Sequence, residues 1–360
     1  MKVIFLVPYP TEGASNRVRV EQFIPYLNQK GIITKVRPFV NRRFYAILYL
    51  HGHYIEKVLW FFISTLNRVL DLFRALGYDV IFVHREAYPF GGPVLESLFC
   101  HMRKPLIFDF DDAIFLPNTS EYNVYIERFK KPEKTVEIIK MSSKVIVGNN
   151  YLKEYALQYN DKVHVIPSSV DTERYRPLAG KREEGKIVIG WIGSMTTRNF
   201  LYELEDVFVR LSEKYENLVF KIVGAPFHSA RLKNIVCKEW SLEDEIADIQ
   251  SFDIGIMPMP NNKWTKGKCA FKTILYMACG IPTVSSAVGM NLEVVDNGVD
   301  GYLVKDEDEW FEKLSLFIQN RDLREAAAKR GREKIEKRYS LQVTAPLLYN
   351  ALKESTQNEK

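Results

Sequence analysis

The segment 264–284 holds the residues best suited to bind an anion. Gly280 is typical of a helix C-terminal cap, so we expect the preceding helix to begin close to Lys268–Phe271, with Lys268 and Lys272 in its first turn. Cations there oppose the helix dipole and destabilise an isolated helix. A bound diphosphate reverses that effect, because it accepts hydrogen bonds from the first-turn N–H groups. The pattern predicts a phosphate site; the alternative is that both lysines point to solvent.

Two strand-to-helix junctions carry small residues that let a ligand approach the backbone. The first contains Gly13, followed by Arg17. The second contains Gly193 and Ser194, with Arg198 just before the next helix. The free N–H groups of a following helix attract phosphate at such junctions. Neither junction is a GxGxxG motif, so a tight structural turn stays open as an alternative for each.

Two carboxylates, Asp111 and Asp112, follow a strand expected at 105–109. Side chains at the carboxyl end of a strand face the ligand crevice of an open α/β sheet, so we predict that they act on a bound substrate. Two alternatives stay open: an aspartate that caps the next helix, and a metal–diphosphate site at the DxD pattern of Asp109 and Asp111. His84, which follows the strand expected at 79–83, is interpreted with its neighbours as a hydrogen-bond partner that shapes the crevice.

Short β-branched runs alternate with longer helical patterns along almost the whole chain, which is typical of βαβ units and parallel sheets. The expected strands are 3–7, 33–38, 79–83, 105–109, 144–147, 163–166, 187–192, 219–223, 254–257, 283–285 and 301–304. A proline- and serine-rich passage from Pro167, continued by the polar stretch 178–186, separates two series of strands. We therefore predict an α/β protein with domains at 1–169 and 170–340, and a C-terminal helix at about 341–360 that packs back on the first domain.

Composition excludes several classes of protein. The formal net charge of +5 is too small to indicate nucleic acid as the main partner. The four cysteines show no CxxC pairing, which argues against a zinc site and a disulfide framework and favours a reducing compartment. The apolar run at the N-terminus is shorter than a signal peptide needs, and we expect a cytoplasmic protein. Residues 321–338, rich in opposite charges at i,i+4 spacing, predict a solvated helix.

One helical stretch, 54–76, is unusually rich in apolar and aromatic residues, and Arg42 and Arg43 precede it. One interpretation is a helix pair packed on the sheet. The other is an interfacial surface at the inner face of the membrane, which receives a lipid-linked acceptor.

The block Phe271–Val284 resembles the signature helix of the GT4-type retaining glycosyltransferases, which have the GT-B fold. Segments 288–295 and 298–304 resemble those that follow it, segment 165–171 is similar to the interdomain passage of the family, and Gly13 with Arg17 to its first glycine loop. The resemblance spans about residues 1–340. It implies two facing Rossmann-like domains with parallel sheets and an active site in the cleft between them.

The resemblance also implies site residues. The donor would be bound by Gly13, Arg17, Gly193, Ser194, Arg198, Lys268, Phe271, Lys272 and Asn291, and the catalytic positions would be Asp111 and Asp112. Trp240 and Glu245 lie where the family seats the nucleotide base. Two glutamates usual in the family are replaced here by Gly267 and Leu275, which places the chain in a branch with lysine on the signature helix.

The implied reaction moves a sugar from a nucleoside-diphosphate sugar to a hydroxyl of a glycan or lipid-linked acceptor, with retained configuration and no metal or other cofactor. The leaving phosphate itself would take the acceptor proton. Because both family glutamates are missing, two other hypotheses stay open: a non-catalytic module that binds nucleotide-sugar or glycan, and a sugar-nucleotide epimerase.

Overall fold

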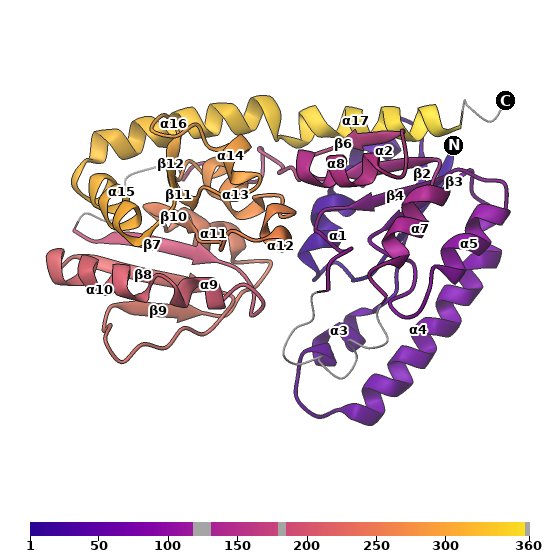
Figure 1. The fold of residues 1–360 in the computed structure, drawn as a ribbon, viewed down its shortest axis with the longest axis horizontal. Coiled ribbons are helices and arrows are strands. Elements are labelled where there is room, and N and C mark those ends of the chain that lie inside the picture. Colours follow the sequence, from indigo (N-terminus) through magenta and orange to yellow (C-terminus); the bar gives the residue numbers. More distant parts are fainter. Residues whose placement is uncertain (118–130, 179–184, 357–360) are drawn as a thin grey trace. The chain divides into compact units, whose positions relative to one another are not determined.

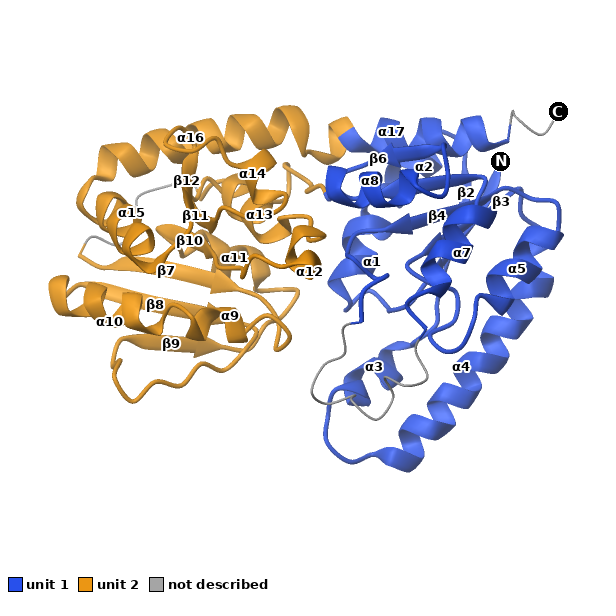
Figure 2. Cartoon of the chain, viewed as in Figure 1, with its two compact units in different colours: residues 1–168, 344–360 blue, residues 169–343 orange. Residues whose placement is uncertain are grey.

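The computed structural model describes residues 1–117, 131–178 and 185–356, and the chain forms two compact units (Figures 1 and 2). Unit 1 comprises Met1–Ser168 and Thr344–Lys360, and unit 2 comprises Ser169–Val343. Helix α17 (Leu341–Ser355) begins in unit 2 and continues in unit 1. Most of the polar stretch 178–186 and the last four residues of the predicted C-terminal helix lie outside the described residues.

Unit 1 contains a six-stranded parallel sheet in the order β2-β1-β3-β4-β5-β6. Its strands are β1 (Lys2–Val7), β2 (Ile33–Pro38), β3 (Val80–His84), β4 (Leu106–Phe110), β5 (Lys144–Val147) and β6 (Val163–Val165). Strands β3, β4 and β5 are buried along their whole length, which explains their unbroken apolar sequences. The connecting helices are α1 (Ala14–Arg19), α2 (Ile24–Gln29), α3 (Arg42–Leu48), α4 (Tyr54–Ala75), α5 (Val94–His101), α7 (Lys134–Met141) and α8 (Asn150–Leu157), with a 3₁₀ turn at Glu21–Phe23.

Unit 2 contains a second six-stranded parallel sheet, in the order β12-β11-β10-β7-β8-β9. Its strands are β7 (Ile187–Ile192), β8 (Leu218–Val223), β9 (Ile235–Lys238), β10 (Ile254–Met257), β11 (Thr283–Ser286) and β12 (Gly301–Val304). Its helices are α9 (Asn199–Tyr202), α10 (Glu205–Lys214), α11 (Glu245–Gln250), α12 (Lys263–Lys266), α13 (Phe271–Ala278), α14 (Asn291–Val294), α15 (Glu307–Gln319) and α16 (Arg321–Arg338). The predicted α/β class with parallel sheets is confirmed.

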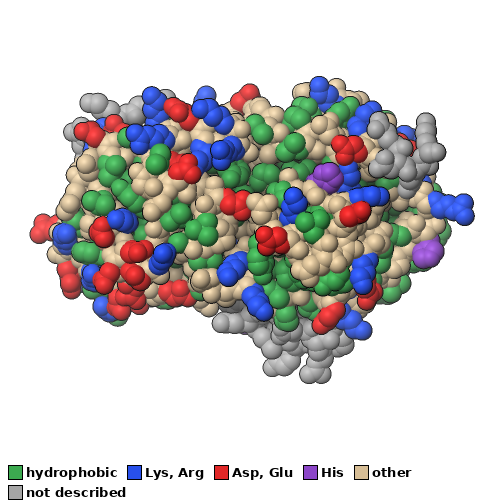
Figure 3. All heavy atoms as spheres, turned by 45° about the horizontal axis from the view of Figure 1, so that its top comes forward, with side chains coloured by type: hydrophobic (Ala, Val, Ile, Leu, Met, Phe, Trp, Pro, Cys, Tyr) green, Lys and Arg blue, Asp and Glu red, His purple; other side chains and the backbone are tan. Residues whose placement is uncertain are grey.

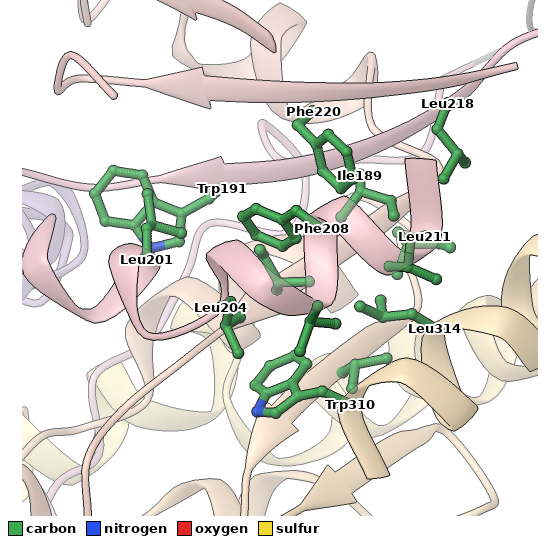
Figure 4. Packing of buried hydrophobic residues seen from close by; sticks show 14 of the residues in the cluster. Ile189, Trp191, Leu201, Leu204, Phe208, Leu211, Leu218, Phe220, Trp310 and Leu314 are labelled. Carbon is green, nitrogen blue, oxygen red and sulfur yellow. The ribbon is translucent and has the colours of Figure 1, made fainter. Parts of the chain in front are cut away.

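In the core of unit 2, helices α10 and α15 pack against the sheet. The ring centres of Phe208 in α10 and Phe220 in β8 lie 4.5 Å apart, and Trp310 and Leu314 of α15 belong to the same cluster (Figure 4). On the surface, α16 forms i,i+4 ion pairs such as Arg321–Glu325, and both signs of charge are spread over the face shown in Figure 3. The predicted solvated helix is confirmed.

Helix α4 buries mainly polar side chains and exposes most of its apolar ones. Its buried residues are Ser64, Arg68, Asp71 and Ala75, spaced along one face. Burial lowers the pKa of Arg68 to about 10, and its guanidinium donates to the Val7 carbonyl at 3.0 Å, which ties the helix to the end of β1. Its apolar side chains are exposed instead: Tyr54, Ile55, Val58, Leu59, Phe62, Leu66, Val69, Leu70 and Phe73. Trp60 and Phe61 pack partly against α3, but the apolar stripe as a whole does not cover the sheet.

Candidate functional site

In unit 2 the order of the strands reverses between β7 and β10, and a crevice is expected at the carboxyl ends of strands at such a point. Helix α13 begins beside this edge. Its N-cap, Ala270, is 1% exposed and adopts a left-handed conformation with φ of 50°. Among the described residues no side-chain hydrogen bond caps the helix there, and the first turn of a helix is where anions bind. A strained, buried backbone of this kind is typical of functional sites.

The C-terminal end of α13 is as predicted. Gly280 has φ of 68°, its N–H donates to Met277, and the N–H of Ile281 donates to Tyr276, which is the Schellman pattern. The Tyr276 hydroxyl also accepts the N–H of Ile192 at 3.0 Å, and its ring lies where a Cβ on Gly255 would be. These contacts fix α13 relative to the ends of β7 and β10.

The prediction that Lys268 lies in the first turn of this helix is wrong. Asn262 caps a separate short helix, α12, and the chain turns at Ala270 before α13 begins at Phe271. Lys268 therefore precedes the helix, with its ammonium group 3.7 Å from the centre of the Trp264 ring. Lys272 does lie in the first turn of α13, and Phe271, the first residue of that helix, is partly exposed.

Three predicted positions converge at the ends of β7 and β8. A Cβ on Gly193 would lie 2.9 Å from Cε of Lys272 and 2.3 Å from the Trp191 ring. A Cβ on Gly224 would lie 2.1 Å from the Gly193 carbonyl oxygen and 3.3 Å from Cβ of Trp240. Only glycine fits these two positions. The structure thus brings Gly193, Lys272 and Trp240 to one edge of the sheet, although they lie far apart in the sequence.

Arg198 and Ser194 follow β7. The exposed Ser194 hydroxyl contacts the Thr196 hydroxyl at 2.8 Å. The Arg198 guanidinium lies 5.9 Å from the centre of the Tyr202 ring, and its Nε is buried with no hydrogen-bond partner among the described residues. A buried donor without an acceptor is costly, and a bound anion is the kind of ligand that would satisfy it.

Trp240 and Glu245 contact each other directly. The indole N–H of Trp240 donates to Oε2 of Glu245 at 2.7 Å, and the Tyr175 hydroxyl donates to Oε1. Glu245 is buried, so both carboxylate oxygens serve to hold protein groups. Its structural role is to orient Trp240, which is partly exposed beside Gly224.

Asn291 has an internal role, contrary to its prediction as a donor ligand. It is fully buried, its amide donates to the Ser286 carbonyl at 3.0 Å, and its side-chain oxygen accepts from Thr273 at 3.3 Å. It therefore fastens α14 to α13 and to the end of β11. Gly267 and Leu275, at the positions of the family glutamates, are also buried.

In unit 1 the strand order reverses between β1 and β3. Gly13, in the loop after β1, is packed so closely that a Cβ there would lie 2.6 Å from Cβ of Tyr9. Arg17 donates to the carbonyls of Thr11 and Glu12, at 3.0 and 3.2 Å, so its guanidinium closes this same loop. Both predicted residues shape the loop.

A buried polar chain runs across the ends of β3 and β4. His84 and Asp109 face each other in the strand register, and Nδ1 of His84 lies 2.6 Å from Asp109 Oδ2. Nε2 of His84 lies 2.5 Å from the Ser15 hydroxyl, and Arg19 forms an ion pair with Asp109. Burial favours a raised pKa for Asp109, but Arg19 and His84 outweigh it and hold that pKa below its ordinary value. The sequence indicated His84 as a hydrogen-bond partner but not its pairing with Asp109 and Ser15, for which polar residues at the ends of adjacent strands are a signal.

Asp111 and Asp112 are joined by Arg85. Nε of Arg85 donates to Asp111 at 2.9 Å, and its terminal nitrogen lies 2.6 Å from Asp112. Arg85 has φ of 63°, a conformation that L-residues rarely adopt. Although burial opposes it, the Arg85 charge holds the pKa of Asp111 well below its usual range. Asp109 and Asp111 thus pair with different cations, and no group of three potential metal ligands occurs among the described residues.

Comparison with known proteins identifies the family. Residues 29–174 match the family model Glycosyltransferase Family 4, and residues 186–320 match Glycosyl transferases group 1. Together these matches cover more than half of the chain. The chain belongs to the GT4-like glycosyltransferases. No curated protein matches the sequence significantly.

Solved structures confirm the GT-B fold of this glycosyltransferase. Anabaena HepE in complex with UDP-glucose has a TM-score of 0.71 at 14% identity, over 98% of this chain and 100% of that one. A glycosyltransferase from Rickettsia africae has a TM-score of 0.70 at 13% identity, over 99% of each chain. Sucrose-phosphate synthase from Thermosynechococcus elongatus has a TM-score of 0.69 at 12% identity, over 98% of each chain.

Proposed function

We propose that this glycosyltransferase transfers a hexose from a UDP-sugar, with retained configuration, to a hydroxyl of a glycan or lipid-linked acceptor. The observation that carries the proposal is the convergence of Gly193, Lys272 and Trp240 at the ends of β7 and β8. HepE, which shares the fold, was solved in complex with UDP-glucose. That donor class suits an edge that offers backbone N–H groups and cations.

The diphosphate would accept hydrogen bonds from the first-turn N–H groups of α13 and from Nε of Arg198. Departure of the sugar develops negative charge on the phosphate, and Lys272 is placed beside Gly193 to stabilise it. Lys268, held over Trp264, and the hydroxyl of Ser194 complete the polar rim. This binding requires no metal, because the protein supplies the positive charge.

Trp240 would pack against the nucleotide base. Its ring is partly exposed, and Glu245 fixes its indole N–H. In unit 1, Asp111 and Asp112 would orient sugar hydroxyls, since their ion pairs with Arg85 hold both carboxylates in place.

A panel of nucleoside diphosphates and UDP-, GDP- and ADP-sugars tests the donor, because a ligand that binds the native state raises the melting temperature according to its affinity. We expect UDP and one UDP-sugar to give the largest shifts, and UDP release once an acceptor is added. No shift with any member would contradict the proposal. A shift without release under any acceptor would indicate a binding module.

We propose further that the apolar stripe of α4 contacts a lipid surface and so gives access to a lipid-linked acceptor. Ile55 is 87% exposed, and the stripe continues through Leu59 and Phe62. Exposed arginines, Arg42 and Arg43 on α3, flank it and suit anionic headgroups. No helix among the described residues is long and apolar enough to cross a membrane.

Sedimentation with phosphatidylglycerol vesicles tests this contact. Full burial of a leucine or phenylalanine side chain is worth about 1.5–3 kcal/mol, so the double variant Leu59→Ser/Phe62→Ser should bind vesicles at least about tenfold more weakly. Leu292→Ser is the matched control, because Leu292 is 55% exposed and Leu59 is 56% exposed. Equal binding by the double variant and the wild type would rule out the stripe as the lipid contact.

A further inference from the structure

A pocket within unit 2 lies apart from the edge proposed to bind the donor. Its walls come from the carboxyl ends of β10, β11 and β12, the start of α15 and the short link between α9 and α10. Its volume is about 270 Å³, and none of the predicted donor ligands lines it. Ligand pockets commonly measure about 300–1,000 Å³, so this space suits a molecule smaller than a nucleotide sugar.

Trp310 of α15 lines this pocket and carries an unpartnered donor. The side chain is only 4% exposed, and its ring packs with Leu204 and Leu314 in the core of unit 2. The indole nitrogen lies on the side of the ring that faces away from Phe208 (Figure 4). Among the described residues its N–H has no hydrogen-bond partner. A buried indole N–H usually has one, so we expect a group in the pocket to accept from it.

The rim of the pocket supplies hydrogen-bond acceptors. Glu203 precedes α10 and Glu307 begins α15, and both are exposed. Within the part of the chain that the structure describes, neither carboxylate has a hydrogen-bond or ion-pair partner. Asp306 differs, because its carboxylate accepts the N–H of Glu309 at 2.9 Å and so caps α15. With Lys305, the rim therefore holds three carboxylates and one ammonium group.

The wall formed by β10 and β11 is apolar and fixed. Pro258, Met259 and Val288 line it, and the last two are buried in one cluster. The N–H of Met259 donates to the Ser286 hydroxyl at 2.9 Å, which ties the segment after β10 to the end of β11. An apolar wall with a few polar groups around it is the usual make-up of a small-molecule site.

These groups together select the chemistry of the ligand. An anion is disfavoured, because carboxylates outnumber ammonium groups at the rim. A metal ion is disfavoured as well, because it cannot accept the N–H of Trp310. A neutral sugar ring satisfies every group: one hydroxyl accepts from Trp310, others donate to Glu203 and Glu307, and a C–H face of the ring lies on the apolar wall.

We propose that this pocket binds one neutral pyranose unit, at a site separate from that of the donor. The inference goes beyond the proposed function, since it adds a second carbohydrate site that lies wholly within unit 2. A free sugar and one unit of a glycan chain offer the same ring and hydroxyl groups. The two sources differ at the anomeric oxygen, which carries a substituent in the chain.

NMR titration of the full chain with glucose, galactose, mannose and N-acetylglucosamine tests the site. The reporter is the indole ¹H–¹⁵N signal of Trp310, assigned by its loss in Trp310→Phe. We expect at least one sugar to shift this signal, equally with and without saturating UDP. Glucose 6-phosphate, which adds negative charge, should shift it less than glucose does. No shift with any sugar, or a larger shift with the phosphate, would overturn the proposal.

Affinity in the variants is followed on the ¹³C-labelled methyl group of Met259, assigned by its loss in Met259→Leu. Trp310→Phe keeps a ring and removes the N–H, so we expect the sugar to bind about 2- to 12-fold more weakly, the equivalent of one hydrogen bond. Glu203→Gln/Glu307→Gln should weaken binding about tenfold, because charge-assisted hydrogen bonds become neutral ones of about half the strength. Both glutamates are exposed, so this variant decides the question even if Trp310→Phe fails to fold.

Glu213→Gln is the matched control, because Glu213 is an exposed glutamate of α10 that does not line the pocket. It should bind the sugar as the wild type does, and UDP affinity should be unchanged in every variant. Wild-type affinity in the double glutamate variant, or a parallel loss of UDP affinity, would overturn the site.

Methyl glycosides of the sugar that binds distinguish its two sources. Binding of a methyl glycoside at least as tight as that of the free sugar would support a unit of a glycan chain, and binding of the free sugar alone would support a free ligand. A wild type that binds no nucleotide sugar would refute the proposed function, and the Trp310 signal would still decide this site.

Discussion

The two sheet edges differ in how their charges are satisfied. At the edge of unit 2, α13 begins without a capping side chain, Arg198 Nε has no partner among the described residues, and Lys272 lies beside Gly193. At the edge of unit 1, arginines and aspartates are already paired with one another. We propose that an anion completes the first edge, whereas at the second edge Arg19 and Arg85 already pair with aspartates. An anionic donor and neutral hydroxyl groups are the ligands that such edges suit.

Removing one partner of a buried ion pair at the sheet edge of unit 1 should have the largest effect on stability. Arg19→Met leaves Asp109 charged and buried, and removal of one partner from a buried pair costs about 3–5 kcal/mol of unfolding free energy. Urea denaturation measures the loss. Arg231→Met is the control, because its pair with Asp206 is exposed and should contribute little to stability. Equal losses in the two variants would contradict the distinction between buried and exposed pairs.

Removing a cation from the other edge should affect binding and leave the fold intact. Lys272→Ala is expected to weaken UDP binding by about 1.5–3 kcal/mol, the size of a hydrogen bond to a charged group, or roughly 10- to 150-fold. Isothermal titration calorimetry measures it. Lys214→Ala is the control, because Lys214 also lies over an aromatic ring, 5.3 Å from the centre of Tyr215. Unchanged affinity in Lys272→Ala would remove Lys272 from the site.

Low pH should lower the unfolding free energy of unit 1, because its paired carboxylates become protonated. The pKa values of Asp109 and Asp111 lie below their ordinary values in the folded state, because neighbouring cations outweigh the effect of burial. Their stabilisation is complete above the unfolded value of about 3.9 and is lost as pH falls through the folded values. Unfolding free energy should therefore decline below about pH 4, and less steeply in Asp111→Asn. An identical decline in that variant would show that Asp111 is not among the groups responsible.

The smallest expected effect is that of removing metal ions. If cations of the protein alone hold the diphosphate, then EDTA should leave UDP affinity and UDP release unchanged. Dialysis against EDTA before the thermal-shift panel tests this. Loss of binding on chelation, restored by Mg²⁺ or Mn²⁺, would show that the diphosphate needs a metal.

Most of the fold was predictable because buried parallel strands have short, uninterrupted apolar sequences. Strands at 33–38, 144–147, 187–192, 254–257 and 301–304 have the predicted bounds. Strand β9 was missed because it lies at the exposed edge of its sheet and its apolar run, Ile235–Cys237, is shorter than those of the buried strands. The helix predicted over 54–76 is present as α4, but the sequence did not indicate that Arg68 and Asp71 are buried against the end of the sheet while apolar residues face outward.

The candidate site was predictable only in part. Glycine and lysine at strand-to-helix junctions indicated Gly193 and Lys272. The turn at Ala270, which excludes Lys268 from α13, depends on a left-handed backbone conformation that an alanine in the sequence does not predict. The internal role of Asn291 and the partnership of Ser15 with His84 depend on contacts between residues distant in sequence. The type of each side chain indicates what chemistry it can perform, but only the folded structure shows which side chains are in contact.

Photolabelling with 5-azido-UDP, followed by peptide mapping, tests most directly whether unit 2 holds the donor. We predict that the labelled peptide comes from unit 2 and contains Trp240 or the neighbouring residues between Gly224 and Glu245, and that excess UDP abolishes the label. Labelling confined to unit 1, or labelling that excess UDP does not compete away, would contradict the account.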